Sequence, residues 1–306
     1  MTDGRRRYTS VMFDSSRWDG FTLRPDDIVI STPAKCGTTW TQMICALLIF
    51  QTPDLPDHLG VLSPWIDMMT RPRDAIVADL DAQTHRRFIK THTPRDGLPI
   101  EPGVTYICVG RDPRDVCLSW DNHIDNTDIE KMITRRSEAV GLDDIMDRLL
   151  EGPPERLDDE IDRFWLWIDE DVDPTENSHN LRGTMHHITT FWNVRDDPDV
   201  LLLHYDDLTR DLEGEMRRLA ARLDIDVPEA RWPQLVAAAS FERMSAGADA
   251  LTPESNTDVW HDNARFFNKG TSGQWRRLLD ADGEARYWKR VNTLATPDVV
   301  QWMHRS

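Results

Sequence analysis

The sequence predicts a single α/β domain, with a P-loop-like parallel sheet that helices flank on both faces. Three observations lead to this fold class. Short apolar runs rich in β-branched residues are typical of buried parallel strands. Segments with apolar residues at helical spacing lie between these runs, which is the pattern of βαβ units. The 306 residues, of which 39% are apolar, are enough for a sizeable core.

Four apolar runs are expected to be the strands of this sheet. They cover residues 27–32, 87–90, 104–109 and 200–205. Each run is too short for a helix, and β-branched residues are frequent in the group. Their continuous apolar character indicates strands buried on both faces rather than on one.

Three helices are expected over residues 39–51, 113–123 and 212–223. The first and the third repeat apolar side chains at helical spacing, so that these side chains form one stripe. The second begins with Asp112 and Pro113, and proline is favoured in the first turn of a helix.

One domain spanning 1–306 is expected, with a core formed by 25–125 and 195–290. Residues of about 126–193 are interpreted as a helical and loop insertion, because this segment is acidic, rich in arginine and contains a Gly-Pro-Pro sequence. Residues 246–269 show few helical signals and are expected to form a long loop, a kind of segment that is often functional.

The composition argues against several classes of partner. The formal net charge is −18, which argues against binding to nucleic acids or anionic membranes, since both are polyanions. Residues 43–50 form the longest apolar stretch, and it is too short for an integral membrane segment. Residues 1–24 lack the apolar centre of a signal peptide.

The four cysteines are expected to be reduced and buried. Cys36, Cys45, Cys108 and Cys117 lie in or beside apolar runs, and no pair has the spacing of a zinc site. A cytoplasmic location is therefore expected. The sequence has no obvious cluster of metal ligands, so no metal is expected in the chemistry.

The first strand leads into a turn that is suited to binding an anion. Residues 33–40 read PAKCGTTW, and a helix follows directly. Backbone N–H groups and the helix dipole favour an anion at such a turn. Gly37 allows close approach of the backbone, and Lys35 adds a positive charge. A Walker A loop carries its lysine after the last glycine, so the order of Lys35 and Gly37 speaks against a P-loop nucleotide kinase.

Two more strands end in residues that suit chemistry on an anionic substrate. His92 follows the second strand within the sequence KTHTP, at the edge where open α/β sheets bind ligands. A pKa near ~6.5 makes histidine a natural general base at neutral pH. Arg111 follows the third strand and can bind phosphate through its planar fork, and Ser119 adds a hydroxyl about two helical turns later.

In order and spacing, these three segments resemble the signatures of the sulfotransferases that use 3′-phosphoadenosine 5′-phosphosulfate (PAPS). The turn resembles P-K-S-G-T-T-W, the second segment K-T-H-x-P and the third R-[ND]-P-[KR]-D-x-x-x-S. The resemblance implies that His92 takes the proton of the acceptor, that Lys35 and Lys90 stabilise the transferring group, and that Arg111 and Ser119 hold the 3′-phosphate. Contacts with the phosphosulfate and adenine are implied for Lys35, Cys36 through its backbone, Gly37, Thr38, Thr39 and Trp40.

Three weaker matches extend the resemblance to Trp275. They are similar to the family elements Y-E-D, S-F-x-x-M and R-K-G-x-x-G-D-W, which lie against the adenine and the 3′-phosphate. The resemblance implies cofactor contacts for Tyr205, Ser240, Phe241, Asn268, Lys269 and Gly270.

The last element departs from the family pattern at two positions. Asn268 replaces an arginine that meets the 3′-phosphate, and Gln274 replaces an aspartate. The contact is therefore expected to be weakened or relocated, with Arg265 or Arg276 as candidates to compensate. The following segment, 276–285, lacks the Thr-Val pair of the family's dimer element, so the oligomeric state stays open.

The predicted function is transfer of a sulfuryl group from PAPS to a hydroxyl of a small-molecule or lipid acceptor, which leaves adenosine 3′,5′-bisphosphate (PAP). An apolar alcohol, a phenol or a glycolipid is expected, because Trp65 and Trp120 could form apolar walls. The sequences SPWID at 63–67 and HRRFIKTHTP at 85–94 resemble bacterial glycolipid-type sulfotransferases. The alternatives are a catalytically silent PAPS- or PAP-binding protein and a P-loop nucleotide kinase.

Overall fold

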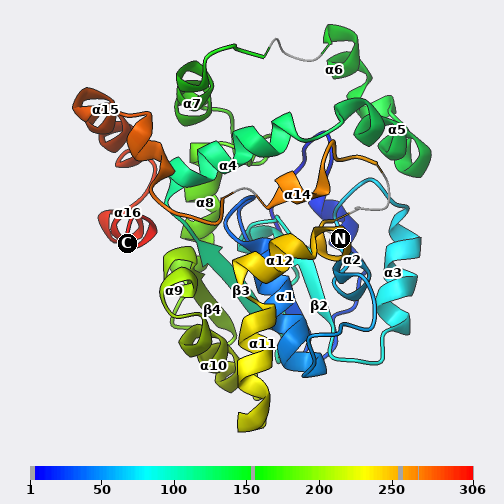
Figure 1. The fold of residues 1–306 in the computed structure, drawn as a ribbon. Coiled ribbons are helices and arrows are strands. Elements are labelled where there is room, and N and C mark those ends of the chain that lie inside the picture. The colour runs from blue at the N-terminus through cyan, green and yellow to red at the C-terminus, as the bar shows by residue number, and fades with distance from the viewer. Residues whose placement is uncertain (1–3, 153–155, 254–257, 268, 306) are drawn as a thin grey trace.

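The computed structural model describes residues 4–152, 156–253, 258–267 and 269–305. At its centre lies a parallel sheet of four strands in the order β2-β1-β3-β4 (Figure 1). The α/β fold class predicted from the sequence is confirmed. The strands are β1 (Ile28–Ser31), β2 (Phe88–Thr91), β3 (Thr105–Gly110) and β4 (Val200–His204), each within one or two residues of its predicted bounds.

The strands are apolar on both faces because both faces are covered. Successive side chains of a strand point to opposite sides of a sheet. Accordingly, Val29 and Cys108 belong to the core on one face, whereas Ile30 and Ile107 belong to the core on the other. This arrangement explains why the strands read as continuous apolar runs rather than as alternating patterns.

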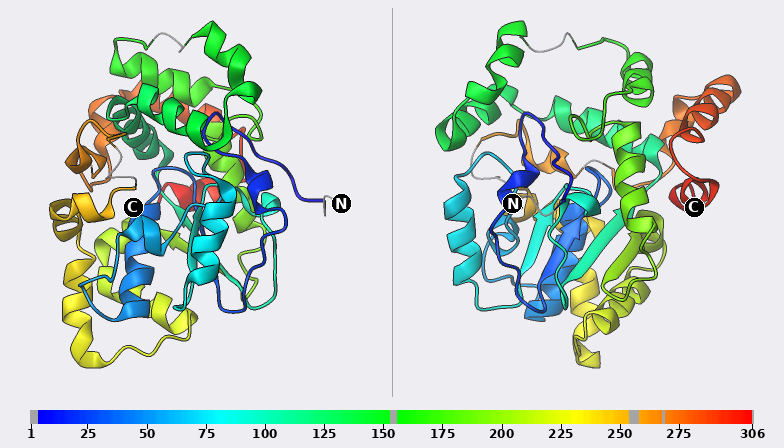
Figure 2. Two further views of the ribbon diagram at one scale, coloured as in Figure 1. Left: turned by 90° about the vertical axis from the view of Figure 1, so that its right-hand side faces the viewer. Right: turned by 180° about the vertical axis from the view of Figure 1, so that it is seen from behind.

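Helices from different parts of the chain cover the two faces, as the views in Figure 2 show. Each of these helices contributes buried apolar side chains to the core on its own side. On the face of Ile30 lie α1 (Thr38–Phe50), α10 (Leu212–Arg222) and α11 (Trp232–Ala238). On the face of Val29 lie α4 (Pro113–Asp125), α7 (Glu160–Asp169), α8 (Leu181–Trp192), α15 (Ala281–Val291) and α16 (Pro297–Met303).

The three helices expected from the sequence correspond to α1, α4 and α10. Asp112 caps α4 by accepting a hydrogen bond from the N–H of Arg114, as the Asp-Pro start predicts. The remaining helices are α2 (Leu59–Leu62), α3 (Arg73–Ala82), α5 (Ile129–Val140), α6 (Met146–Glu151), α9 (Tyr205–Arg210), α12 (Phe241–Ala246), α13 (Ala248–Leu251) and α14 (Asn263–Phe266).

The segment 126–193 contains α5 to α8. In Figure 1, α5 to α7 lie at the top of the molecule, beyond α4, which begins where β3 ends. Helix α8 returns and packs against β3 and β4. The division of the chain into a core and an insertion stays a prediction. The long loop expected over 246–269 is wrong in part, because α13 and α14 lie within it.

All four cysteines are buried and free, which agrees with the expectation from their apolar surroundings. Among the residues that the structure describes, no helix is both long enough and apolar enough to cross a bilayer.

Candidate active site

The predicted site residues follow the four strands at one edge of the sheet. Thr32 follows β1, His92 follows β2, Arg111 follows β3 and Tyr205 follows β4. Because all four strands are parallel, their carboxyl ends share this edge, where open α/β sheets bind ligands. We call Lys35, His92, Arg111 and Tyr205 the strand-end site.

The turn between β1 and α1 has the conformation of an anion cradle. Lys35 and Gly37 both have left-handed backbones, with φ of 66° and 108°. A side chain at Gly37 would be strained by that φ, and its Cβ would lie 3.3 Å from the Tyr205 ring. The turn opens onto the N-terminus of α1, where Thr38 and Thr39 are the first residues. The free N–H groups of that helix end favour an anion.

Arg111 joins the two predicted anion-binding segments into one site. Its Nη1 donates a hydrogen bond of 3.0 Å to the carbonyl oxygen of Lys35. Its guanidinium lies 4.1 Å from the centre of the Tyr205 ring. Within the described parts of the chain, nothing bonds its buried Nε. A buried guanidinium with an unused donor fits an anionic ligand such as a phosphate.

Lys35 lies among other cationic and aromatic groups. Its Nζ is 4.6 Å from the centre of the Phe266 ring and 3.5 Å from Nδ1 of His123. Burial lowers the pKa of Lys35 to about 7, and the positive charges of Arg111 and Lys90 add to this effect. A buried lysine whose pKa is lowered further by neighbouring positive charges indicates a site that is completed by an anion.

His92 is held in the tautomer that a general base requires. Its Nδ1 lies 2.7 Å from the carbonyl oxygen of Thr32. A carbonyl oxygen can only accept, so Nδ1 carries the proton and Nε2 has the free lone pair. Burial and then the charge of Lys90 lower the pKa of His92 well below its usual value, so the ring is neutral at pH 7. Trp65 contacts both His92 and Lys90. Its ring packs edge-on against His92, with ring centres 4.7 Å apart, and the Lys90 Nζ lies 4.1 Å from the centre of the Trp65 ring.

Aromatic rings meet where the resemblance implies the adenine. Trp40 and Tyr205 pack edge-on, with their ring centres 5.3 Å apart. The Trp40 Nε1 donates to the carbonyl oxygen of Ala239, two residues before α12. Ser240 caps α12 by accepting a hydrogen bond from the Arg243 N–H.

The backbone at Gly270 packs directly against the ring of Phe241. A Cβ at Gly270 would be 2.4 Å from the Phe241 ring, and the backbone there has a φ of 64°. Any residue with a side chain at position 270 would therefore clash with the Phe241 ring, and only glycine fits there. The segments of Phe241 and Gly270, which carry two of the weaker matches to the family elements, are thus in contact although they lie far apart along the chain.

The other residues that were predicted to contact the cofactor differ in their position and burial. Ser119 is half-buried on α4, and Lys269 lies exposed in a cleft beside Arg277. The thiol of Cys36 belongs to the core, and burial raises its pKa to about 12. The predicted contact through the backbone of Cys36 stays a prediction. Asn268 lies outside the described residues.

Asp115 holds the loop that follows Gly270, a role that the sequence motifs do not reveal. Its carboxylate accepts hydrogen bonds from the N–H groups of Gly273 at 2.6 Å and Gln274 at 2.9 Å. Asp115 lies in the first turn of α4, four residues before Ser119. The same helix thus presents Ser119 and fixes the loop of Lys269 and Gly270.

Two histidines and two aromatic rings that the motifs do not indicate form a cluster with Trp120, and this cluster reaches Lys35 through His123 and Phe266. Trp120 stacks on His179 with ring centres 4.5 Å apart, and also on His123 at 5.3 Å. His123 contacts the rings of Trp260 and Phe266 as well. The four-residue spacing of Ser119 and His123 places both on one face of α4 and could have indicated His123. Nothing in the local sequence indicates His179.

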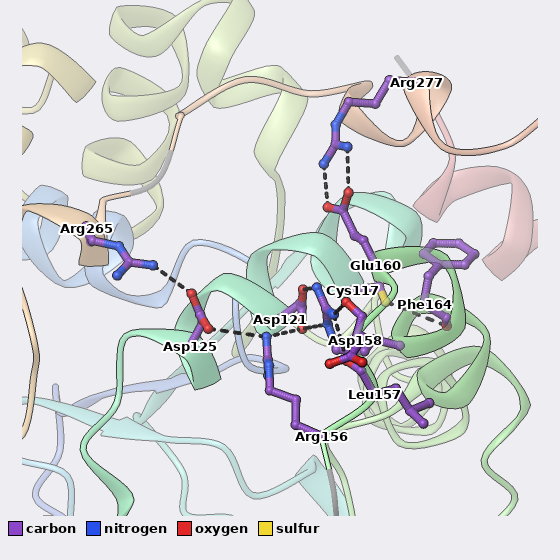
Figure 3. A network of polar contacts seen from close by, with 11 residues as sticks. Cys117, Asp121, Asp125, Arg156, Leu157, Asp158, Glu160, Phe164, Arg265 and Arg277 are labelled. Carbon is purple, nitrogen blue, oxygen red and sulfur yellow. Dashed lines mark hydrogen bonds and ion pairs between the residues drawn. The ribbon is translucent and has the colours of Figure 1, made fainter.

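A network of arginines and carboxylates lies along α4, beside this region (Figure 3). Asp121 pairs with Arg163 and Arg156, Asp125 pairs with Arg265, and Glu160 pairs with Arg277. We call these seven residues the α4 flank. Arg265, a candidate to replace the family's missing arginine, is thus paired with a carboxylate.

No group of three or more His, Cys, Asp or Glu side chains is arranged as metal ligands in the described part of the chain. The expectation that the chemistry needs no metal stays a prediction.

Comparison with known proteins decides the family. The model of the sulfotransferase domain matches residues 25–305. The chain belongs to the sulfotransferase family. The glycolipid sulfotransferase of Mycobacterium bovis BCG is 40% identical over 317 residues, covering 99% of this chain and 95% of the relative. The glycolipid sulfotransferase of Mycobacterium tuberculosis is also 40% identical, over 311 residues with the same coverage.

Solved sulfotransferase folds resemble the structure as well. Retinol dehydratase in complex with retinol and PAP has a TM-score of 0.69 at 19% identity, covering 92% of this chain and 85% of that one. Mouse sulfotransferase SULT7A1 with PAP has a TM-score of 0.66 at 20% identity, covering 94% and 91%. The family assignment and the similarity to the bacterial glycolipid type, both predicted from the motifs, are therefore confirmed.

Proposed function

We propose that this sulfotransferase transfers the sulfuryl group of PAPS to a hydroxyl of a glycolipid, with His92 as the general base. The hydrogen bond from the His92 Nδ1 to the Thr32 carbonyl supports this role most directly. It leaves a neutral ring with a basic Nε2 at the edge where the phosphate-binding turn lies. General base catalysis by a positioned histidine typically contributes about 10²–10⁴-fold in rate.

The strand-end site has the groups that a doubly charged nucleotide requires. The turn of Lys35 and the helix end of α1 suit the 5′-phosphosulfate, and Arg111 and Ser119 suit the 3′-phosphate. The direct bond between Arg111 and the Lys35 backbone makes the two cradles neighbours. A net charge of −18 is compatible with an anionic substrate because these cations are concentrated at one edge.

In the transfer, the acceptor oxygen forms a bond to sulfur as the bond from sulfur to the bridging phosphate oxygen breaks, and PAP leaves. His92 takes the proton of the acceptor at Nε2. Lys35 and Lys90 stabilise the negative charge that builds on the oxygens, so the protein contributes alignment and charge stabilisation.

A glycolipid is the acceptor that the site and its relatives favour. Trp65 contacts His92, and Trp120 stacks with His123, which itself contacts Lys35. The half-buried ring of Trp65 beside the base suits the apolar face of a sugar ring. The mycobacterial relatives at 40% identity are named as glycolipid sulfotransferases.

Labelled PAPS, mixed with the protein and a panel of glycolipids, phenols and simple alcohols, tests the proposal. We expect labelled product from glycolipids, with rates that saturate in both substrates. Transfer to phenols alone would overturn the acceptor class. Binding of PAP without transfer to any acceptor would support the silent-binder alternative instead. Consumption of ATP with Mg²⁺ would support a nucleotide kinase.

A further inference from the structure

Asp67 is a buried carboxylate directly behind the base, and no motif of the family resemblance assigns it a task. It is fully buried, at 0% exposure. Its Oδ2 accepts hydrogen bonds from the hydroxyls of Thr91 and Thr93, the two residues that flank His92. Burying a carboxylate is costly unless its hydrogen bonds compensate. The position therefore needs an explanation beyond packing.

Hydrogen bonds hold the backbone in place on both sides of His92. We call Thr91 and Thr93, together with these bonds, the frame. The Thr91 hydroxyl, which donates to Asp67, also accepts from the Thr93 N–H at 2.9 Å. The Thr93 carbonyl accepts from the Ser31 hydroxyl at 2.6 Å. Every polar group of Thr93 is thereby engaged, so the residue after His92 cannot rotate independently.

On its other side, His92 is held through its ring by Thr32. The imidazole is thus fixed by one bond at Nδ1, while its backbone is fixed by the frame of Thr91 and Thr93. Catalytic groups need such support, because misplacement by about 1 Å can cost roughly 10²-fold in rate.

We propose that Asp67 is a positioning residue, which sets the direction of the His92 Nε2 by binding both neighbouring threonine hydroxyls. The inference rests on the proposed role of His92 as the base. It assigns to Asp67 no contact with a substrate and no proton transfer.

A purely structural role is the competing explanation. Asp67 also accepts from the Trp18 Nε1 at 3.2 Å, and its carbonyl accepts from the Asp14 N–H at 2.9 Å. The same carboxylate thus anchors the N-terminal segment. This third donor provides a matched control, because it binds the same oxygen and has no direct link to the strand that carries His92.

The test compares Thr93→Val with Trp18→Phe, since each removes one donor from Asp67. Thr93→Val keeps the side-chain shape, whereas Trp18→Phe also shortens a buried side chain. Thr93→Val should lower kcat by roughly 10–100-fold, with the affinity for PAP unchanged within about twofold. Trp18→Phe should lower the melting temperature and keep the wild-type kcat. Thr93→Ser, which retains the hydroxyl, should restore most of the activity.

NMR of the histidine ring nitrogens provides a readout that is independent of turnover. A single Nδ1–H tautomer of His92 is expected in the wild type and in Trp18→Phe, and a mixture of tautomers in Thr93→Val. Equal kcat values for Thr93→Val and Trp18→Phe, or an unchanged His92 tautomer in both, would overturn the role of Asp67.

Asp67→Asn separates hydrogen bonding from charge. The three donors meet a single oxygen, so an amide oxygen can take its place, and kcat should stay within about threefold of the wild type. A much larger loss, with the Nδ1–H tautomer retained, would contradict positioning. A wild type that transfers no sulfate would instead count against the proposed function, and the tautomer measurement would still test the frame.

Discussion

At the strand-end site, cationic and basic side chains are buried and held by backbone carbonyls. Arg111 bonds the Lys35 carbonyl and His92 bonds the Thr32 carbonyl. Along the α4 flank, by contrast, arginines and carboxylates satisfy one another near the surface, as in Asp125 with Arg265. The many charged residues of the chain therefore serve two purposes.

In the α4 flank each cation already has an anionic partner, so nothing there calls for a ligand. In the strand-end site the direct contacts of the cations are with neutral groups: Arg111 bonds the carbonyl oxygen of Lys35, and the Lys35 Nζ lies against His123 and the ring of Phe266. Burial, and then the charges of Arg111 and Lys90, lower the pKa of Lys35, and these positive charges are available to a bound phosphate or sulfate. Substitutions in the two regions should therefore have clearly different effects.

The largest effect is expected for His92→Ala. Removing the base should lower kcat by about 10²–10⁴-fold. Because the ring is not part of the phosphate-binding turn, the affinity for PAP measured by calorimetry should stay near the wild-type value. His85→Ala is the matched control, since His85 precedes the same strand at the opposite edge of the sheet. A variant of His92 that keeps normal turnover would refute the base assignment.

The pH dependence of PAP binding should reveal Lys35. In the free protein its pKa is lowered to about 7, so above that pH the amine is mostly neutral. Binding an anion favours the charged form, so affinity should fall as the pH rises above about 7, by up to about tenfold per pH unit. Titration calorimetry between about pH 7.5 and 9 measures this slope. In Lys35→Arg, whose guanidinium stays charged, the slope should disappear; persistence of the slope would assign it to another group.

A smaller effect is expected from loosening the loop of Lys269 and Gly270. Asp115→Ala removes the acceptor of two backbone N–H groups and should weaken PAP binding by roughly tenfold, which is about 1.4 kcal/mol. Asp121→Ala, on the same helix but in the α4 flank, should leave the affinity within about twofold. Equal losses in both variants would remove the distinction between the two regions.

The smallest effect is expected in the flank itself. Glu160→Gln breaks the ion pair with Arg277, which is largely exposed to solvent. Exposed pairs contribute about 0–1 kcal/mol, so urea denaturation should show a change in unfolding free energy below about 1 kcal/mol. A much larger loss of stability would show that the network is an essential structural element.

The sequence could predict those parts of the site that are local in the chain. Strand ends, the turn of Lys35 and the motifs of His92 and Arg111 each lie within about ten residues, and parallel strands bring them to one edge. Asp67 and Asp115 could not be assigned in this way, because their partners depend on tertiary packing. His179 and Trp260 were missed for the same reason, as neither lies in a recognisable pattern.

Titration of PAP and of AMP, which lacks the 3′-phosphate, into the wild type and Arg111→Ala tests whether the two cradles bind one nucleotide. If Lys35 and Arg111 bind opposite ends of one nucleotide, the wild type should prefer PAP by roughly 10–100-fold, in line with about 1.5–3 kcal/mol for hydrogen bonds to a charged group. Arg111→Ala should lose most of that preference while its affinity for AMP changes little. An Arg111→Ala variant that keeps the full preference for PAP would contradict the account.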